Sequence, residues 1–306
     1  MKWKKIGNII RPDNIKRDWM VTHAMDPTVD FVSGDIYRVY FCGRNNENQS
    51  LIGYAELDIT NPYEIIKTPI KPVLGLGELG AFDDNGVTAS WIVNHDNKKY
   101  LYYIGWKPRS TTRFSLMTGL AISEDGGETF YRYSRAPILN LTDHEPFSIL
   151  TAPCVLKQEK IWKMWYVSCV DWLHADLPRY NIKYAESNDG ITWRQDGVVC
   201  IDFISERETA LARPCVLFED NIYKMWYSFK DPEIGYRMGY AESRDGIQWK
   251  RLDSQVGIEV SDSGWDSEMI QYPYVFDHKG HKYMFYNGNG YGANGAGLAV
   301  LSSDKG

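Results

Sequence analysis

Short runs of alternating apolar and polar residues follow one another along the whole chain, and turn residues such as Asp-Gly separate them. The runs are rich in Val, Ile, Tyr and Trp, as in YRVYFCGR from Tyr37 and YKMWYSFK from Tyr223. A period of two, combined with β-branched and aromatic residues, is typical of strands that bury one face. No segment of the sequence has the period of an amphipathic helix, so the pattern predicts an all-β protein.

The strand pattern recurs in five copies of about sixty residues, a spacing typical of repeat architectures. Each copy begins with a short apolar strand, and these strands start near residues 26, 88, 151, 212 and 271. A proline opens each of them except the second, where Ser90 stands in its place. A second and a third strand follow in every copy. The repeat therefore predicts four-stranded antiparallel sheets arranged radially.

The copies are most alike at one turn, which reads YAESNDGITW from Tyr184 and YAESRDGIQW from Tyr240. A third version, SEDGGETF, begins at Ser123. Asp-Gly supplies the positive φ of a tight turn, so each stretch is predicted to join the third strand of its copy to the fourth. A turn that recurs in several copies cannot be a single active site, and we interpret it as scaffold.

The repeat predicts a five-bladed β-propeller in which residues 1–306 form a single domain. The fifth copy ends after its third strand, at LAVLSSDKG, whereas WKKIGNII from Trp3 has the pattern of a fourth strand. We therefore expect residues 3–9 to pair with the strand near 297–301, so that the N-terminal strand closes the last blade.

Composition and charge narrow the possible partners. The net charge of −6 argues against nucleic acid or an anionic membrane surface. The N-terminus lacks an apolar leader and no apolar run approaches the length of a membrane span, which predicts a cytoplasmic protein without a membrane partner. Five cysteines without C-x-x-C spacing predict free thiols. The sequence contains no recognisable metal or cofactor motif. The glycine-rich GNGYGANGAG from Gly288 does not fit a phosphate-binding loop, because it lies between strands and not before a helix.

The five strand starts, the MWY motifs of the second strands and the YAES-x-DGI-x-W motifs together resemble one superfamily of propellers. This is the arabinanase, levansucrase and invertase superfamily of glycosidases, with the related mannoside phosphorylases, and the resemblance covers the whole chain. It implies a five-bladed propeller, a saccharide or glycoconjugate as partner, and a funnel on the axis where the innermost strands begin. It also implies an aspartate of the first blade as base or nucleophile, a second aspartate that tunes pKa values, and a glutamate of a later blade as acid.

Asp26 matches the first of these residues, because it stands directly before the proline that opens the first innermost strand. The corresponding positions of the other copies carry Ala89, Ala152, Arg213 and Tyr272, so the second aspartate and the glutamate of the superfamily are missing there. Hydrolysis of a glycoside needs two carboxyl groups beside one bond. The candidates to replace the missing pair lie in the loops that precede the strands: Asp84, Glu145, Glu208 and Glu268. We expect Glu208 or Glu268 to be the catalytic acid.

Cations and aromatic residues are also expected near the funnel. Four cations, His23, Arg44, Arg213 and Lys230, would suit a phosphate, a uronic or sialic acid, or a sugar nucleotide. They would instead form ion pairs that hold the loops if no anion binds there. Arg44 or Arg213 is expected to lower the pKa of Asp26. Four aromatic residues would stack on sugar rings or pack in the core. They are Trp106, Trp172, Tyr272 and Tyr291. Asp84 joins the substrate-binding candidates.

Two functions from different classes follow. The first is a carbohydrate-active enzyme that hydrolyses or phosphorolyses a glycoside in the axial funnel. The alternative is a non-hydrolytic glycan-binding protein or an accessory of polysaccharide biosynthesis, which the missing glutamate favours. A protein-interaction scaffold ranks third, because the carboxylates and aromatic residues gather at the strand starts. The sequence leaves open whether the protein is an enzyme.

Overall fold

A computed structural model describes residues 1–302 and consists almost entirely of strands. The prediction of an all-β fold is confirmed. The helices within the described residues are one turn long: α1 (Pro12–Ile15), α2 (Asn289–Gly292) and a 3-10 turn at Asp253–Gln255. Residues 303–306, the end of the predicted domain, lie outside the described residues.

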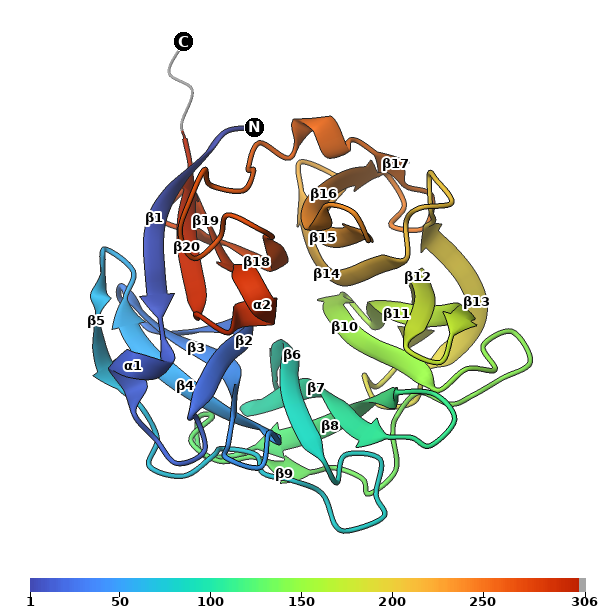
Figure 1. The fold of residues 1–306 in the computed structure, drawn as a ribbon, viewed down its shortest axis with the longest axis horizontal. Helices are drawn as coiled ribbons and strands as arrows, with labels where there is room; N and C mark the ends of the chain where they lie inside the picture. The colour runs from blue at the N-terminus through green and yellow to red at the C-terminus, as the bar shows by residue number, and fades with distance from the viewer. Residues whose placement is uncertain (303–306) are drawn as a thin grey trace.

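The strands pair in chain order as antiparallel groups of four, which lie around a central axis (Figure 1). The first group contains β2 (Thr22–Ser33), β3 (Ile36–Arg44), β4 (Ser50–Asp58) and β5 (Asn61–Lys67). The second contains β6 (Gly86–His95), β7 (Lys98–Pro108), β8 (Phe114–Ser123) and β9 (Tyr131–Arg132). The third contains β10 (Ile149–Gln158), β11 (Ile161–His174), β12 (Leu177–Ser187) and β13 (Arg194–Ile201).

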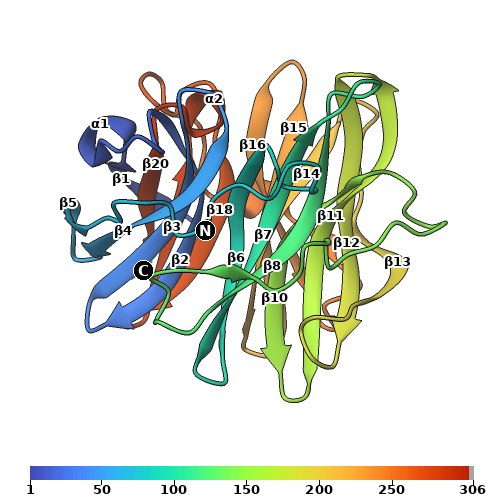
Figure 2. The ribbon, with the colours of Figure 1, turned by 90° about the horizontal axis from the view of Figure 1, so that it is seen from below.

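The fourth group contains β14 (Ala210–Glu219), β15 (Ile222–Asp231), β16 (Gly235–Ser243) and β17 (Lys250–Arg251). The fifth contains β18 (Gln271–His278), β19 (His281–Asn287), β20 (Ala296–Leu301) and the N-terminal strand β1 (Trp3–Ile10). In β1, Trp3 faces Leu301 and Asn8 faces Gly297, so the pairing expected for residues 3–9 is present. The side view shows α2 at one end of the molecule (Figure 2).

Hydrogen bonds join the innermost strand of each group to that of the next. The links run from Thr28 Oγ1 to Ser90 O (3.2 Å), Ser90 Oγ to Pro153 O (2.8 Å), Val216 N to Cys154 Sγ (3.3 Å), Val275 N to Cys215 Sγ (3.1 Å) and Tyr274 OH to Val29 O (3.0 Å). The last link returns from the fifth group to the first. Two cysteines thus act as buried acceptors, and all five cysteines are free and buried, as the sequence predicts.

The repeated Asp-Gly turns are the points where neighbouring groups meet. Three turn carbonyls accept hydrogen bonds from second-strand aromatic residues of the preceding group: Gly127 from Tyr40 (2.9 Å), Gly190 from Tyr102 (2.8 Å) and Gly246 from Trp165 (2.7 Å). Gly190 and Gly246 have φ values of 75° and 78°, which favour glycine. The turns are therefore structural, and their near-identity follows from this common contact.

A tyrosine, a carboxylate and a cation form the same buried trio in four groups. The trios are Tyr103–Asp83–Arg132, Tyr166–Glu145–Lys183, Tyr227–Asp253–Arg251 and Tyr286–Asp266–Lys5. Phe41 takes the tyrosine's place in the first group and packs against Trp19 at a ring distance of 5.9 Å. Because a buried carboxylate needs hydrogen bonds and a counter-charge, each trio fixes the loop that carries its acid.

Within residues 1–302, one trio takes its cation from the N-terminal strand. This cation is Lys5, whose Nζ lies 2.7 Å from Asp266 Oδ2. Replacing Lys5 with Met leaves the buried Asp266 carboxylate with its tyrosine partner alone. We expect Lys5→Met to lower the free energy of unfolding by about 1–3 kcal/mol. Lys4→Met, at an exposed neighbouring position, should change it little. Urea unfolding of both variants measures the difference, and equal stabilities would contradict the structural role of this pair.

Candidate functional site

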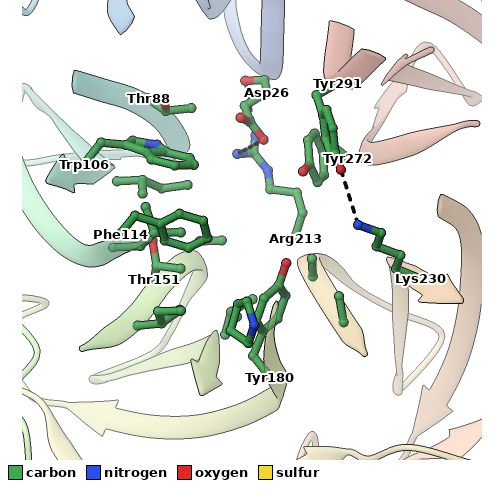
Figure 3. Close-up of a pocket in the computed structure, with 18 of the residues that line it drawn as sticks. Asp26, Thr88, Trp106, Phe114, Thr151, Tyr180, Arg213, Lys230, Tyr272 and Tyr291 are labelled. Carbon is green, nitrogen blue, oxygen red and sulfur yellow. Dashed lines mark hydrogen bonds and ion pairs between the residues drawn. The ribbon is translucent and has the colours of Figure 1, made fainter. Parts of the chain in front are cut away.

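A cavity of about 330 Å³ opens on the axis, and every group contributes residues to its wall. Figure 3 shows Trp106 and Phe114 on one side, Tyr272 and Tyr291 opposite them, and Arg213 reaching towards Asp26 between the two sides. The wall is largely apolar and aromatic, with a small number of charged side chains. This composition is typical of pockets that bind small molecules.

A repeated backbone irregularity turns side chains into the cavity. The residue before the opening proline has a positive φ in four groups: 55° at Asp26, 49° at Ala152, 52° at Arg213 and 59° at Tyr272. The strand register breaks at these positions, as it does in a β-bulge. Non-glycine residues adopt this conformation only at a cost of about 1 kcal/mol or more. All four side chains line the cavity.

Arg213 forms the floor of the cavity. Its guanidinium comes from β14 and crosses the axis to the first and second groups, where Nη1 donates to Ala89 O (2.8 Å). Nη2 donates to Pro27 O (3.1 Å) and to Thr28 Oγ1 (2.9 Å). The side chain is 2 % exposed, so these neutral acceptors take the place of water around a buried cation.

Asp26 stands beside this guanidinium, with Oδ1 3.5 Å from Arg213 Nη1. Asn287 fixes the backbone there, because its Oδ1 accepts from Asp26 N (2.8 Å) and its Nδ2 donates to Ala24 O (2.6 Å). Burial raises the pKa of Asp26 to about 6, although Arg213 and Arg44 act to lower it. The expectation of a lowered pKa is therefore wrong: the loss of water around the carboxylate outweighs both cations.

Arg44, Trp106, Lys230 and Tyr272 line the cavity together with Asp26 and Arg213. His23 is not among the lining residues. Burial, assisted by the charge of Arg44, lowers the pKa of His23 to about 4, so the imidazole is neutral at physiological pH. The expectation that His23 supplies a positive charge is corrected accordingly.

The expected partner acids of Asp26 lie elsewhere. Both oxygens of Glu208 accept from Arg251 at 2.8 Å, and this carboxylate is buried away from the cavity wall. Glu268 is exposed and does not line the cavity.

Asp84 also lies outside the cavity wall and pairs with Lys107 at 3.1 Å. Burial acts to raise its pKa, but hydrogen bonds from Gly80 and Lys107 outweigh burial and lower it. Asp84 and Glu208 are thus engaged with other residues of the fold, as is Glu145 in its trio with Tyr166 and Lys183. None of the four candidate acids lines the cavity beside Asp26.

Several lining residues were not anticipated from the sequence. Asp176, at the tip of the β11–β12 hairpin, is the second carboxylate of the cavity wall within residues 1–302, and Arg113 lies on the neighbouring β7–β8 connection. The backbone N–H of Arg113 donates to Ala175 O (2.8 Å), which ties the two hairpins together. The greater length of the third copy between its second and third strands is the signal that could have identified Asp176.

Within residues 1–302, two threonine hydroxyls of the cavity wall are buried without a hydrogen-bond partner: Thr151 Oγ1 and Thr209 Oγ1. Tyr180 and Tyr236 face each other with hydroxyl oxygens 2.9 Å apart. A buried polar group without a partner is costly, so these threonines are available to a ligand that carries hydroxyl groups.

No set of three His, Cys, Asp or Glu side chains within residues 1–302 is arranged to hold a metal ion. In the same part of the chain, no helix has the length and apolar character needed to cross a membrane.

The raised pKa of Asp26 gives a prediction for stability. The carboxyl has a pKa of about 6 when folded and an ordinary value of 3.8, so its ionised form destabilises the fold. This cost is complete above about pH 6 and disappears as the pH falls below about 4. Asp26→Asn should therefore increase the free energy of unfolding at neutral pH, by an amount on the order of 2 kcal/mol. Urea unfolding across this pH range tests it, and a variant less stable at neutral pH would refute it.

No family model matches the chain. Two proteins of Mycobacterium tuberculosis, the uncharacterized proteins MT1551 and Rv1502, are each 39% identical to it over 305 residues, which is 99% of this chain and 100% of theirs. Among solved structures, a glycoside hydrolase superposes with a TM-score of 0.75 at 19% identity over 97% of this chain and 91% of that one. The α-L-arabinofuranosidase of Lactobacillus brevis gives a TM-score of 0.71 at 12% identity over 97% and 95%.

A thermostable family-43 glycoside hydrolase gives a TM-score of 0.69 at 16% identity, covering 92% of this chain and 91% of that one. These identities are low, so the likeness shows a shared fold and leaves the chemistry to the site itself. The chain shares its fold with these glycoside hydrolases, and it belongs to the family of MT1551 and Rv1502.

Proposed function

We propose that the protein is a carbohydrate-active enzyme that takes a glycoside into the axial cavity and cleaves its glycosidic bond with the help of Asp26. The carrying observation is the position of Asp26, a carboxyl group in a cavity lined by aromatic residues and unpartnered hydroxyls, with a pKa of about 6. Such a carboxyl group is protonated below about pH 6, and a fraction of it stays protonated near neutral pH, so it can both donate and accept a proton in this range. The glycoside hydrolases among the structural neighbours support the same class of substrate.

In the proposed reaction, Asp26 acts as the acid, in place of the base or nucleophile that the resemblance implies. It donates its proton to the leaving oxygen as the bond from the anomeric carbon to that oxygen breaks. Water or phosphate forms the new bond to the anomeric carbon, and when water attacks, the proton that it loses passes to solvent. Trp106 and Tyr272 offer faces for the sugar, and Thr151 and Thr209 offer hydroxyls to it.

The proposal includes the architecture around this cavity. We take the groups of four strands as the five blades of one propeller domain, with β1 completing the last blade. The pairing of β1 with β20 and the hydrogen bond from Tyr274 to Val29 support it. The cytoplasmic location predicted from the sequence belongs to the same proposal.

One observation favours the alternative, a protein that binds a glycan without cleaving it. Glu208 is held by Arg251, and the cavity wall within residues 1–302 offers Asp176 as the one further carboxylate. Hydrolysis requires two carboxyl groups flanking the bond, so a cavity in which Asp176 does not act with Asp26 would retain binding and lose this chemistry.

Asp26→Asn separates the two functions. In an enzyme, the substitution should reduce turnover by a factor of about one hundred or more, since the proton donor is lost. The control Asp220→Asn, at an exposed position far from the cavity wall, should keep full activity. The assay is a panel of aryl glycosides and oligosaccharides, with and without phosphate. Binding of a saccharide without turnover in the parent protein would favour the alternative, and activity that survives Asp26→Asn would remove this residue from the mechanism.

The pH profile assigns the role of Asp26. A proton donor with a pKa of about 6 is competent below that pH and loses its proton above it. We therefore expect kcat/KM to decline as the pH rises through about 6. A profile that instead rises through the same pH would assign Asp26 as the base.

A further inference from the structure

The charges on the cavity wall do not balance. Arg44, Arg113, Arg213 and Lys230 line it, against the carboxylates Asp26 and Asp176. The chain as a whole carries a net charge of −6, so cations gather here against the overall charge. An excess of cations in a cavity attracts anions and raises their local concentration.

Two of these cations have fixed roles or surroundings. Arg213 is satisfied by backbone carbonyls and by Thr28, and it faces Asp26. Arg113 is exposed on its connection between strands. Arg44 and Lys230 are half-buried. They therefore differ from the buried Arg213 and from the exposed Arg113.

Arg44 and Lys230 occupy the same structural position in two groups. Arg44 comes three residues after Phe41 in β3, and Lys230 comes three residues after Tyr227 in β15. β3 and β15 are the second strands of their groups. Trp106 stands at the equivalent position of β7. The side chains at this position line the cavity in all three groups.

Neither cation has an acidic partner. Within residues 1–302, no carboxylate oxygen lies within 4.0 Å of Arg44 or of Lys230. Arg44 donates to Asn48 Oδ1 (3.1 Å), and Lys230 donates to Tyr291 OH (3.3 Å) and lies 5.6 Å from the ring centre of Tyr236. Half-buried cations that hold only neutral partners retain donors for a ligand anion.

We propose that Arg44 and Lys230 form an oxyanion site in the axial cavity, which takes a carboxylate or phosphate group. Both side chains line the cavity that Asp26 also lines, so the oxyanion and the sugar of the proposed function share one cavity. The hydroxyl of Tyr291 holds Lys230 at the wall (Figure 3). The anion has two possible sources, an acidic group carried by the sugar or free inorganic phosphate. The presence of a sugar in the cavity rests on the proposed function. Binding of the anion does not, because it can be measured without a sugar.

The experiment measures binding by calorimetry at low ionic strength with three probes: glucuronate, glucose and inorganic phosphate. Glucuronate or phosphate should bind more tightly than glucose. Arg44→Met and Lys230→Met should each weaken that binding by about ten- to a hundredfold, the loss typical of a hydrogen bond to a charged group. Arg44→Lys, which keeps the charge, should lose less than Arg44→Met.

Matched controls remove a positive charge outside the cavity. Arg109→Met and Lys71→Met lie at exposed positions that do not line it, and both should bind the anion like the parent protein. Thermal melting of each variant confirms that it is folded. A preference for glucuronate assigns the anion to the sugar, whereas binding of phosphate assigns it to the free ion.

The outcomes for the site and for the proposed function are separable. Equal binding of glucose and both anions, or anion binding that survives both Met variants, would overturn the oxyanion site even if a neutral glycoside is cleaved. Anion binding that requires Arg44 and Lys230 supports the site, whether or not the parent protein cleaves any glycoside. Cleavage that depends on Asp26 is the separate readout for the proposed function.

Discussion

The Arg213 guanidinium is the contact on which the geometry of the cavity depends. A buried cation must find acceptors, and Arg213 finds them on strands β2 and β6 across the axis, in Pro27 O, Thr28 Oγ1 and Ala89 O. The contact therefore holds the innermost strands of three groups in one arrangement. The same side chain forms part of the cavity wall.

The same contact explains the state of Asp26. The carboxylate lies near Arg213, but the guanidinium is already occupied by neutral acceptors and its nearest nitrogen is 3.5 Å away. The cation consequently offsets only part of the cost of burial, and the pKa of Asp26 rises. A backbone held at positive φ keeps the carboxyl in this environment. Strain and burial together produce a group with the properties of an acid–base catalyst.

Carboxylates in this protein separate into two classes by their partners. Asp83, Glu145, Asp253 and Asp266 each accept from a tyrosine and pair with a cation, so their position serves the scaffold. Glu208 joins this class through Arg251, which also pairs with Asp253. Asp26 differs because its surroundings oppose its charge. The likeness to glycoside hydrolases shows a shared fold, and the roles of individual carboxylates depend on this chain's own contacts.

The sequence by itself determined the strands, their repeat, the structural role of the Asp-Gly turns, the pairing of residues 3–9 with the strand near 297–301, and the free cysteines. These features follow from local patterns of apolar and turn residues, which act over a few positions and repeat along the chain. The tertiary structure alone decided that Glu208 pairs with Arg251, that His23 is neutral and that Asp176 reaches the cavity. It also decided the pKa of Asp26. Arg213, which is 187 positions away along the chain, acts to lower this pKa, but burial raises it by more. Burial and the distances between side chains of different groups set these properties, and neither quantity is encoded in a local stretch of sequence.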